Sequence, residues 1–137
     1  MNSLAALNWL AVLVASLTGF VLGGLWYGPL FLKPWLRASG MTMERGRQQN
    51  KLQVFGLAWL ANFIAAAGVG LFMGHHHGAL VGAHLGLLCG FVFTATSLAV
   101  VYLFESRPLQ HWLINAGYLL VNFASMGAVL GAWPASG

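Results

Sequence analysis

The chain has 137 residues, of which 59% are hydrophobic and only 6% are charged, and its net charge is +4. Soluble globular domains carry about 25% charged residues, so this chain has too few to cover a water-facing surface. The composition therefore argues against a soluble enzyme, a nucleic-acid-binding protein and a disordered segment. Its single cysteine, Cys89, also leaves no intrachain disulfide. We expect an all-α integral membrane protein.

Uncharged stretches divide the chain into four segments, each long enough to cross a bilayer. Residues 1–32 and 52–104 contain no charged side chain, and a membrane helix needs about 20 apolar residues. The second stretch divides at its polar histidine cluster, and a last apolar stretch follows Arg107-Pro108. We expect one transmembrane domain, a four-helix bundle in which the first helix bends at Gly28-Pro29. The predicted spans are residues 4–32, 52–74, 79–104 and 109–133, with a basic connecting loop at 33–51.

The cations predict how the chain is oriented. Five of the six Lys and Arg residues lie between Lys33 and Lys51, and Arg107 lies in the third connection. Because basic loops stay in the cytoplasm, we expect both termini to be periplasmic in a bacterial inner membrane. No cation precedes the long first apolar stretch, so we interpret it as a retained helix rather than a signal peptide. The basic loop would also suit anionic lipid headgroups.

The fourth span carries a polar face. Its members recur at spacings of four and three residues, which keeps them on one side of a helix: His111, Asn115, Tyr118, Asn122 and Ser125. Asn62 in the second span lies at a similar depth, and we predict a hydrogen bond from it to Tyr118 or Asn122. Two interpretations remain open, namely hydrogen bonding that holds the bundle together and the lining of a path for a small solute or ion.

Glycines mark the faces expected to pack closely. Gly78, Gly82, Gly86 and Gly90 recur at every fourth residue in the third span, and Gly19 and Gly23 share a face of the first. Such repeats let a second backbone approach, in the same chain or in another copy. The tryptophans mostly fall near span ends, as in the aromatic belts of membrane proteins.

The histidines are the candidates for a metal or proton-sensing site. His75, His76 and His77 are consecutive, and His84 follows seven residues later. Imidazole binds zinc, copper or nickel. No acidic residue or second cysteine lies near to complete a ligand set, so we favour a polar loop at the membrane surface and assign no metal and no cofactor.

The two ends of the chain resemble a known family. The opening contains Asn8-Trp9-Leu10-Ala11-Val12-Leu13, Gly23, Trp26-Tyr27-Gly28-Pro29-Leu30-Phe31 and Trp35. The last span contains His111-Trp112-Leu113-Ile114-Asn115-Ala116-Gly117-Tyr118. Both segments resemble a family of small bacterial membrane proteins catalogued as domain-of-unknown-function family 1761. The resemblance implies a four-helix inner-membrane protein and carries over no catalytic residues.

The sequence favours a protein that is not an enzyme. It contains no carboxylate pair, no Ser–His–acid set and no phosphate-binding loop. Abundant small residues without buried charge favour a structural or accessory component that forms homo-oligomers in the lipid bilayer. The alternative is a small channel or transporter whose path is lined by the polar face of the fourth span. We expect no nucleic acid partner.

Overall fold

A computed structural model describes residues 7–74 and 76–133. These residues form helices, with no strand among them. Within the described ranges, four helical rods are long and apolar enough to cross a membrane: Trp9–Leu30, Lys51–Met73, Ala79–Phe104 and Leu109–Ala132. The last three match the predicted spans to within a residue at each end. The first was predicted too long, because its helix starts at Trp9; residues 4–6 lie outside the described ranges.

Local chemistry determines both ends of the first rod. Asn8 precedes α1 (Trp9–Leu25), and its side-chain oxygen accepts hydrogen bonds from the N–H groups of Leu10 and Ala11, both at 3.1 Å. At the other end α1 widens into the π-helical turn η2 (Trp26–Leu30), which contains Pro29. Proline has no N–H to donate. The Phe31 N–H therefore bonds the Trp26 carbonyl, five residues back, at 2.9 Å.

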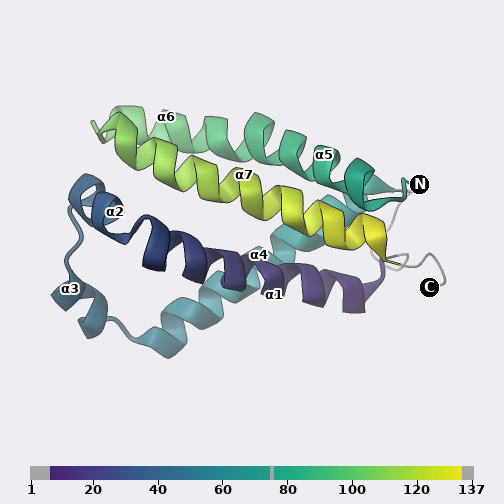
Figure 1. Ribbon diagram of the computed structural model, residues 1–137, viewed down its shortest axis with the longest axis horizontal. Coiled ribbons are helices and arrows are strands. Elements are labelled where there is room, and N and C mark those ends of the chain that lie inside the picture. The colour runs from purple at the N-terminus through teal and green to yellow at the C-terminus, as the bar shows by residue number, and fades with distance from the viewer. Residues whose placement is uncertain (1–6, 75, 134–137) are drawn as a thin grey trace.

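The basic segment that we expected to be a loop contains two short helices. These are α2 (Leu32–Ser39) and α3 (Met43–Gln48). Gly40, at φ +74°, ends α2 in the left-handed conformation that glycine adopts without strain. Thr42 begins α3 by accepting the N–H of Arg45 at 3.1 Å. Figure 1 shows α2 and α3 at one end of the molecule, which we call the basic end.

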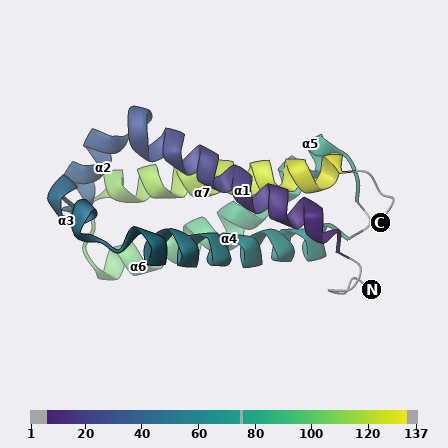
Figure 2. The ribbon, with the colours of Figure 1, turned by 90° about the horizontal axis from the view of Figure 1, so that it is seen from below.

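The remaining rods complete two layers. The third rod joins α5 (Ala79–Cys89), the π-helical turn η3 (Gly90–Ala95) and α6 (Thr96–Phe104), and it runs beside α7 (Leu109–Ala132). α4 (Lys51–Met73) packs mainly against α1. At the basic end, α1 and α7 lie in one layer and α4 and α6 in the other, as Figure 2 shows.

The closest helix packing is between α5 and α7. A Cβ atom built on Gly82 would overlap the carbonyl group of Gly127, and one built on Gly127 would overlap that of Gly82. Farther along, Gly86 meets the carbonyl of Phe123, and the N–H of Gly78 donates to the Gly131 carbonyl at 2.7 Å. The predicted glycine stripe therefore packs against another helix of the same chain, the alternative that the sequence had left open.

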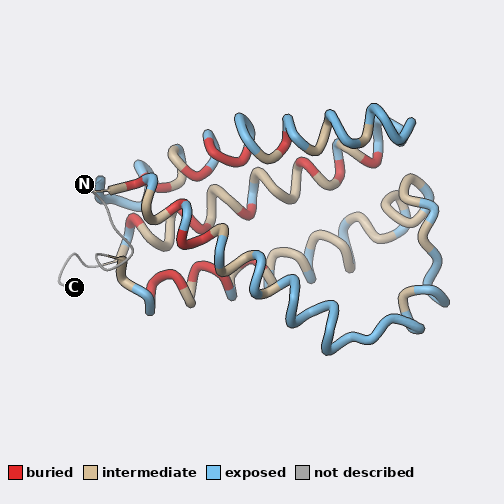
Figure 3. Tube along the Cα trace, turned by 180° about the vertical axis from the view of Figure 1, so that it is seen from behind, coloured by how far each residue is buried: buried red, intermediate tan, exposed pale blue. Residues whose placement is uncertain are grey.

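The apolar core lies at the end of the molecule opposite the basic end. It joins α1, α4 and α7 and consists of Val12, Ala15, Ala66, Ala67, Val69, Met73 and Met126. Figure 3 shows that buried residues concentrate toward this end, whereas α4 is exposed at the other. Residues 51–58 are all exposed. The molecule is thus tightly packed at one end and open at the basic end.

Gly82→Leu should destabilise the protein by about 3 kcal/mol or more, because a large side chain would push two backbones apart in a packed region. Gly56→Leu is the matched control, since a Cβ at Gly56 meets nothing within 4 Å. Denaturant melts in detergent measure both. Gly82→Leu melting like the wild type would contradict this packing.

Candidate functional site

Polar side chains from four rods meet in two clusters along α7. In the first cluster, the hydroxyl of Tyr27 donates to Asn115 Oδ1 at 2.6 Å, and Asn115 Nδ2 donates to the hydroxyl of Tyr102 at 2.7 Å. The ring of Tyr102 in turn stacks on that of His111, with centroids 4.6 Å apart. This chain of contacts connects η2, α6 and α7 near the basic end.

The second cluster lies deeper, where α1, α4 and α7 cross. Asn122 Nδ2 donates to Asn62 Oδ1 at 2.9 Å, and Asn62 Nδ2 donates to the Ser16 carbonyl at 2.8 Å. Gly19 leaves room for both amides, because a Cβ atom there would overlap them. The hydrogen bond predicted between Asn62 and Asn122 is therefore present, and Gly19 packs against it.

Tyr118 lies between the two clusters. Its hydroxyl donates to the Gly19 carbonyl at 2.9 Å rather than to Asn62, and its ring lies 5.3 Å from that of Tyr27. Gly23, the second packing glycine of the first span, lies against the Tyr118 ring. Ser125 joins neither cluster, since its hydroxyl bonds the Asn122 carbonyl of its own helix at 2.8 Å.

Tryptophans connect the π-helical turns to neighbouring helices. The indole N–H of Trp26, in η2, donates to the Ile114 carbonyl at 2.9 Å. The indole N–H of Trp112 donates to the carbonyl of Ala95, the last residue of η3, at 3.0 Å. These two indoles hold helices together, a role that position near a span end did not predict. Both hydrogen bonds join a widened turn to α7.

A cleft of about 1260 Å³ opens at the basic end between these helices. Tyr27, Tyr102, His111, Asn115 and Tyr118 all line it. A second hollow of about 410 Å³ shares Gly19, Ala58 and Tyr118 with it and reaches Asn62 and Asn122. Beyond these two amides lies the apolar core. The two hollows thus adjoin as one cleft, which is open at the basic end and also along the side of its deeper part, and which ends at the apolar core.

Among residues 7–74 and 76–133, two buried side-chain atoms along the cleft have no hydrogen-bond partner. They are Nδ1 of His111, a residue 5% exposed, and Oδ1 of Asn122, a residue 3% exposed. Both residues line the hollows. Buried polar atoms in proteins nearly always have a partner, which can be water or a ligand. These atoms therefore mark positions where a bound molecule could form hydrogen bonds.

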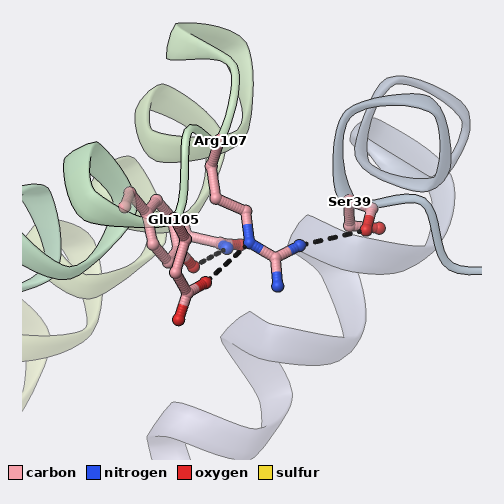
Figure 4. A network of polar contacts seen from close by, with 5 residues as sticks. Ser39, Glu105 and Arg107 are labelled. Atoms are coloured by element: carbon pink, nitrogen blue, oxygen red, sulfur yellow. Dashed lines mark hydrogen bonds and ion pairs between the residues drawn. The ribbon is translucent and has the colours of Figure 1, made fainter.

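Two arginines lie at the opening of the cleft at the basic end. Arg107 and Arg45 both line it. Arg107 forms an ion pair with Glu105 of the same connection, with Nε 2.9 Å from Oε1. Its Nη1 also donates to the Ser39 carbonyl at 3.3 Å (Figure 4). This contact brings both basic connections to the same end of the molecule, as alternation through four spans requires.

The histidine cluster does not form a metal site within the described residues. His75 lies outside them. His76 Nδ1 lies 2.6 Å from the Met73 carbonyl, and His84 is exposed with Nδ1 2.8 Å from the Leu80 carbonyl. Over residues 7–74 and 76–133, no three His, Cys, Asp or Glu side chains are placed to hold a metal ion.

Sequence reasoning missed Tyr27 and Tyr102. Neither belongs to a polar face of its own helix, so helical spacing does not single them out. A simpler signal was present, because the chain has only three tyrosines and all three line the cleft.

These features define a class: a multi-pass membrane protein with a cleft between its helices, whose mainly apolar walls carry a few polar side chains. The chain matches the family described as "Protein of unknown function (DUF1761)" over residues 10–131 and belongs to that family, which confirms the resemblance of its two ends. Comparisons with curated proteins and with solved structures found no match.

Asn62→Leu should lower the free energy of unfolding by about 1 kcal/mol, because interhelical hydrogen bonds in membranes are individually modest. A double-mutant cycle with Asn122→Leu should give a coupling near 0.6 kcal/mol. Gln53→Leu, at an exposed amide of the same helix, serves as the control and should not couple to Asn122. A cycle with no coupling would show that the Asn62–Asn122 contact contributes nothing to stability.

Proposed function

We propose that this protein is a small, non-enzymatic carrier of the bacterial inner membrane that admits a small molecule to its cleft from the basic end. The observation that carries the proposal is the cleft itself, in which polar side chains from four rods line a continuous space. This is the transporter alternative that the polar face of the fourth span had raised.

The closed inner end favours a carrier over an open channel. Beyond Asn62 and Asn122, the apolar side chains of Val12, Ala15 and Met126 are fully buried. An ion would have to shed its water to cross such a region, at a cost of many kcal/mol. A carrier needs one open and one closed end in each of its states, and this arrangement has both.

The clefts of carriers also need elements that can move. η2 lines the cleft through Tyr27 and Gly28, and η3 lines the second hollow through Thr94. Such π-helical turns are frequent at functional sites. One wall of the cleft is the first half of α4, which is exposed. The other wall is α6, which packs only sparsely on α7. Few contacts therefore fix either wall in place. We propose that these two walls move when a molecule enters or leaves.

Cysteine labelling tests the proposal directly. In a Cys89→Ala background, cysteines placed at Ala58 or Leu98, which line the cleft, should react with a membrane-impermeant thiol reagent added from the side of the basic loops. The same positions should be inert from the opposite side. Leu57→Cys is the control: Leu57 is 59% exposed and lies outside the cleft lining, so it should face lipid and be inert from both sides.

Labelling from neither side would contradict an accessible cleft. Equal labelling from both sides would instead indicate a continuous channel and would contradict the carrier.

The orientation is part of the proposal. We propose that the basic end is cytoplasmic and that both termini are periplasmic, because positive loops stay inside. An alkaline phosphatase fusion at Gly137 should therefore be active, and one near Gly46 inactive. The reverse pattern would place the cleft mouth on the periplasmic side.

Self-association remains a separate proposal. Its main motive was the glycine stripe, and those glycines pack against α7 of the same chain. A homo-oligomer would have to use other surfaces, such as the exposed side of α4. Crosslinking in native membranes should trap dimers if copies associate, and a monomer at every protein concentration would contradict it.

A further inference from the structure

We propose that the molecule admitted to the cleft is an anionic phospholipid from the leaflet at the basic end. Its phosphate would lie between Arg45 and Arg107, and one acyl chain would enter the cleft between α4 and α6. This inference rests on the proposed carrier function and names its ligand class.

The charge at the mouth matches an anionic headgroup. Arg45 and Arg107 both line the cleft, and no Asp or Glu is among its lining residues in the described part of the chain. Arg107 has one carboxylate neighbour, Glu105, and Arg45 pairs with no carboxylate within residues 7–74 and 76–133. Guanidinium groups bind phosphate through charge-assisted hydrogen bonds.

Both arginines lie outside the membrane-spanning rods, where lipid headgroups are expected. Neither belongs to a membrane-spanning rod: Arg45 is in α3, and Arg107 lies in the connection between α6 and α7. The contact of Arg107 with Ser39 keeps the two connections together (Figure 4). Anionic lipids are attracted to basic residues placed in this way beside a membrane surface.

The walls of the cleft suit an acyl chain. Val54 and Phe55 of α4 and Leu98 of α6 line it, and all three belong to rods long enough to span the bilayer. Figures 1 and 3 show α4 and α6 apart at the basic end, and the cleft that residues of both helices line is open to the outside of the molecule. A wholly water-soluble anion would gain nothing from these apolar walls, whereas an acyl chain gains apolar contact along them.

His111 is placed for the lipid's ester group. It lies four residues after Arg107 on the chain, in the first turn of α7. Its Nδ1 is buried without a partner, and its ring is held by stacking on Tyr102. The glycerol esters of a phospholipid lie just below the phosphate. We assign His111 Nδ1 as the hydrogen-bond donor to an ester carbonyl oxygen of the lipid.

Native mass spectrometry of the delipidated full chain tests the assignment. The protein is titrated with phosphatidylglycerol or with phosphatidylcholine of the same acyl chains. One phosphatidylglycerol should bind about tenfold more tightly than phosphatidylcholine, and the double variant Arg45→Gln/Arg107→Gln should lose this preference. The charge-matched control Arg47→Gln/Lys51→Gln removes two exposed cations that line neither the cleft nor the hollow beside Arg107, and it should keep the preference.

A second pair of variants tests the acyl chain. Ala58→Phe fills the cleft and should weaken binding of both lipids, whereas Leu57→Phe, on the outer side of α4, should not. Melting curves of each variant show that it is folded. Should Ala58→Phe fail to fold, Leu98→Trp fills the opposite wall in the same way.

Each unfavourable result has a defined meaning. Equal loss in the Arg47→Gln/Lys51→Gln control would show diffuse surface attraction and overturn the assignment. Displacement of the lipid by millimolar glycerol phosphate would indicate a soluble anion and would also overturn it. No lipid preference together with one-sided cysteine labelling would reject the lipid alone, whereas loss of that labelling would reject the carrier as well.

Discussion

Where α5 meets α7, glycines on both helices bring the backbones so close that each carbonyl occupies the space of a missing side chain. Lipid tails are as apolar as the helices, so in a bilayer such close packing replaces the hydrophobic effect as the source of helix association. Only glycine permits this approach, and the contact holds one side of α7. The other sides of α7 are then directed toward α1 and α4, where Asn122 and Tyr118 find their partners.

The packing of α7 against α5, α1 and α4 determines which partners the polar side chains find. An amide or hydroxyl facing hydrocarbon is costly, so those directed into the molecule bond either one another or backbone carbonyls. At the closed end, Asn62, Asn122 and the Ser16 carbonyl form such a set. Toward the basic end α4 diverges from α6, and the helices no longer fill the space between them. The same α7 face that is bonded internally at depth therefore lines an open cleft near the membrane surface.

The widened turns η2 and η3 connect the two regions. Pro29 imposes the first, because it cannot donate the hydrogen bond of a regular helix. Two indole hydrogen bonds then connect these turns to α7. Trp26 in η2 donates to the Ile114 carbonyl of α7, and Trp112 of α7 donates to the Ala95 carbonyl in η3. Tyr27 is thereby directed toward Asn115, and Tyr102 on α6 is brought against the same residue. Irregular helix geometry thus gathers all three tyrosines of the chain at one site.

The sequence by itself determined the class, the spans and the polar face, because bilayer thickness and helical periodicity act on each segment separately. It also placed Asn62 at the depth of Tyr118 and Asn122, because depths follow from counting residues, and it indicated the chain's family; the structure decided for Asn122. Only the tertiary structure decided which helix the Gly82 stripe contacts, that α2 and α3 fold within the basic segment, and that Tyr27 and Tyr102 share a site. Those outcomes depend on how helices rotate and diverge relative to one another. That geometry is determined by contacts between residues far apart in the chain, which the periodicity of a single segment does not contain.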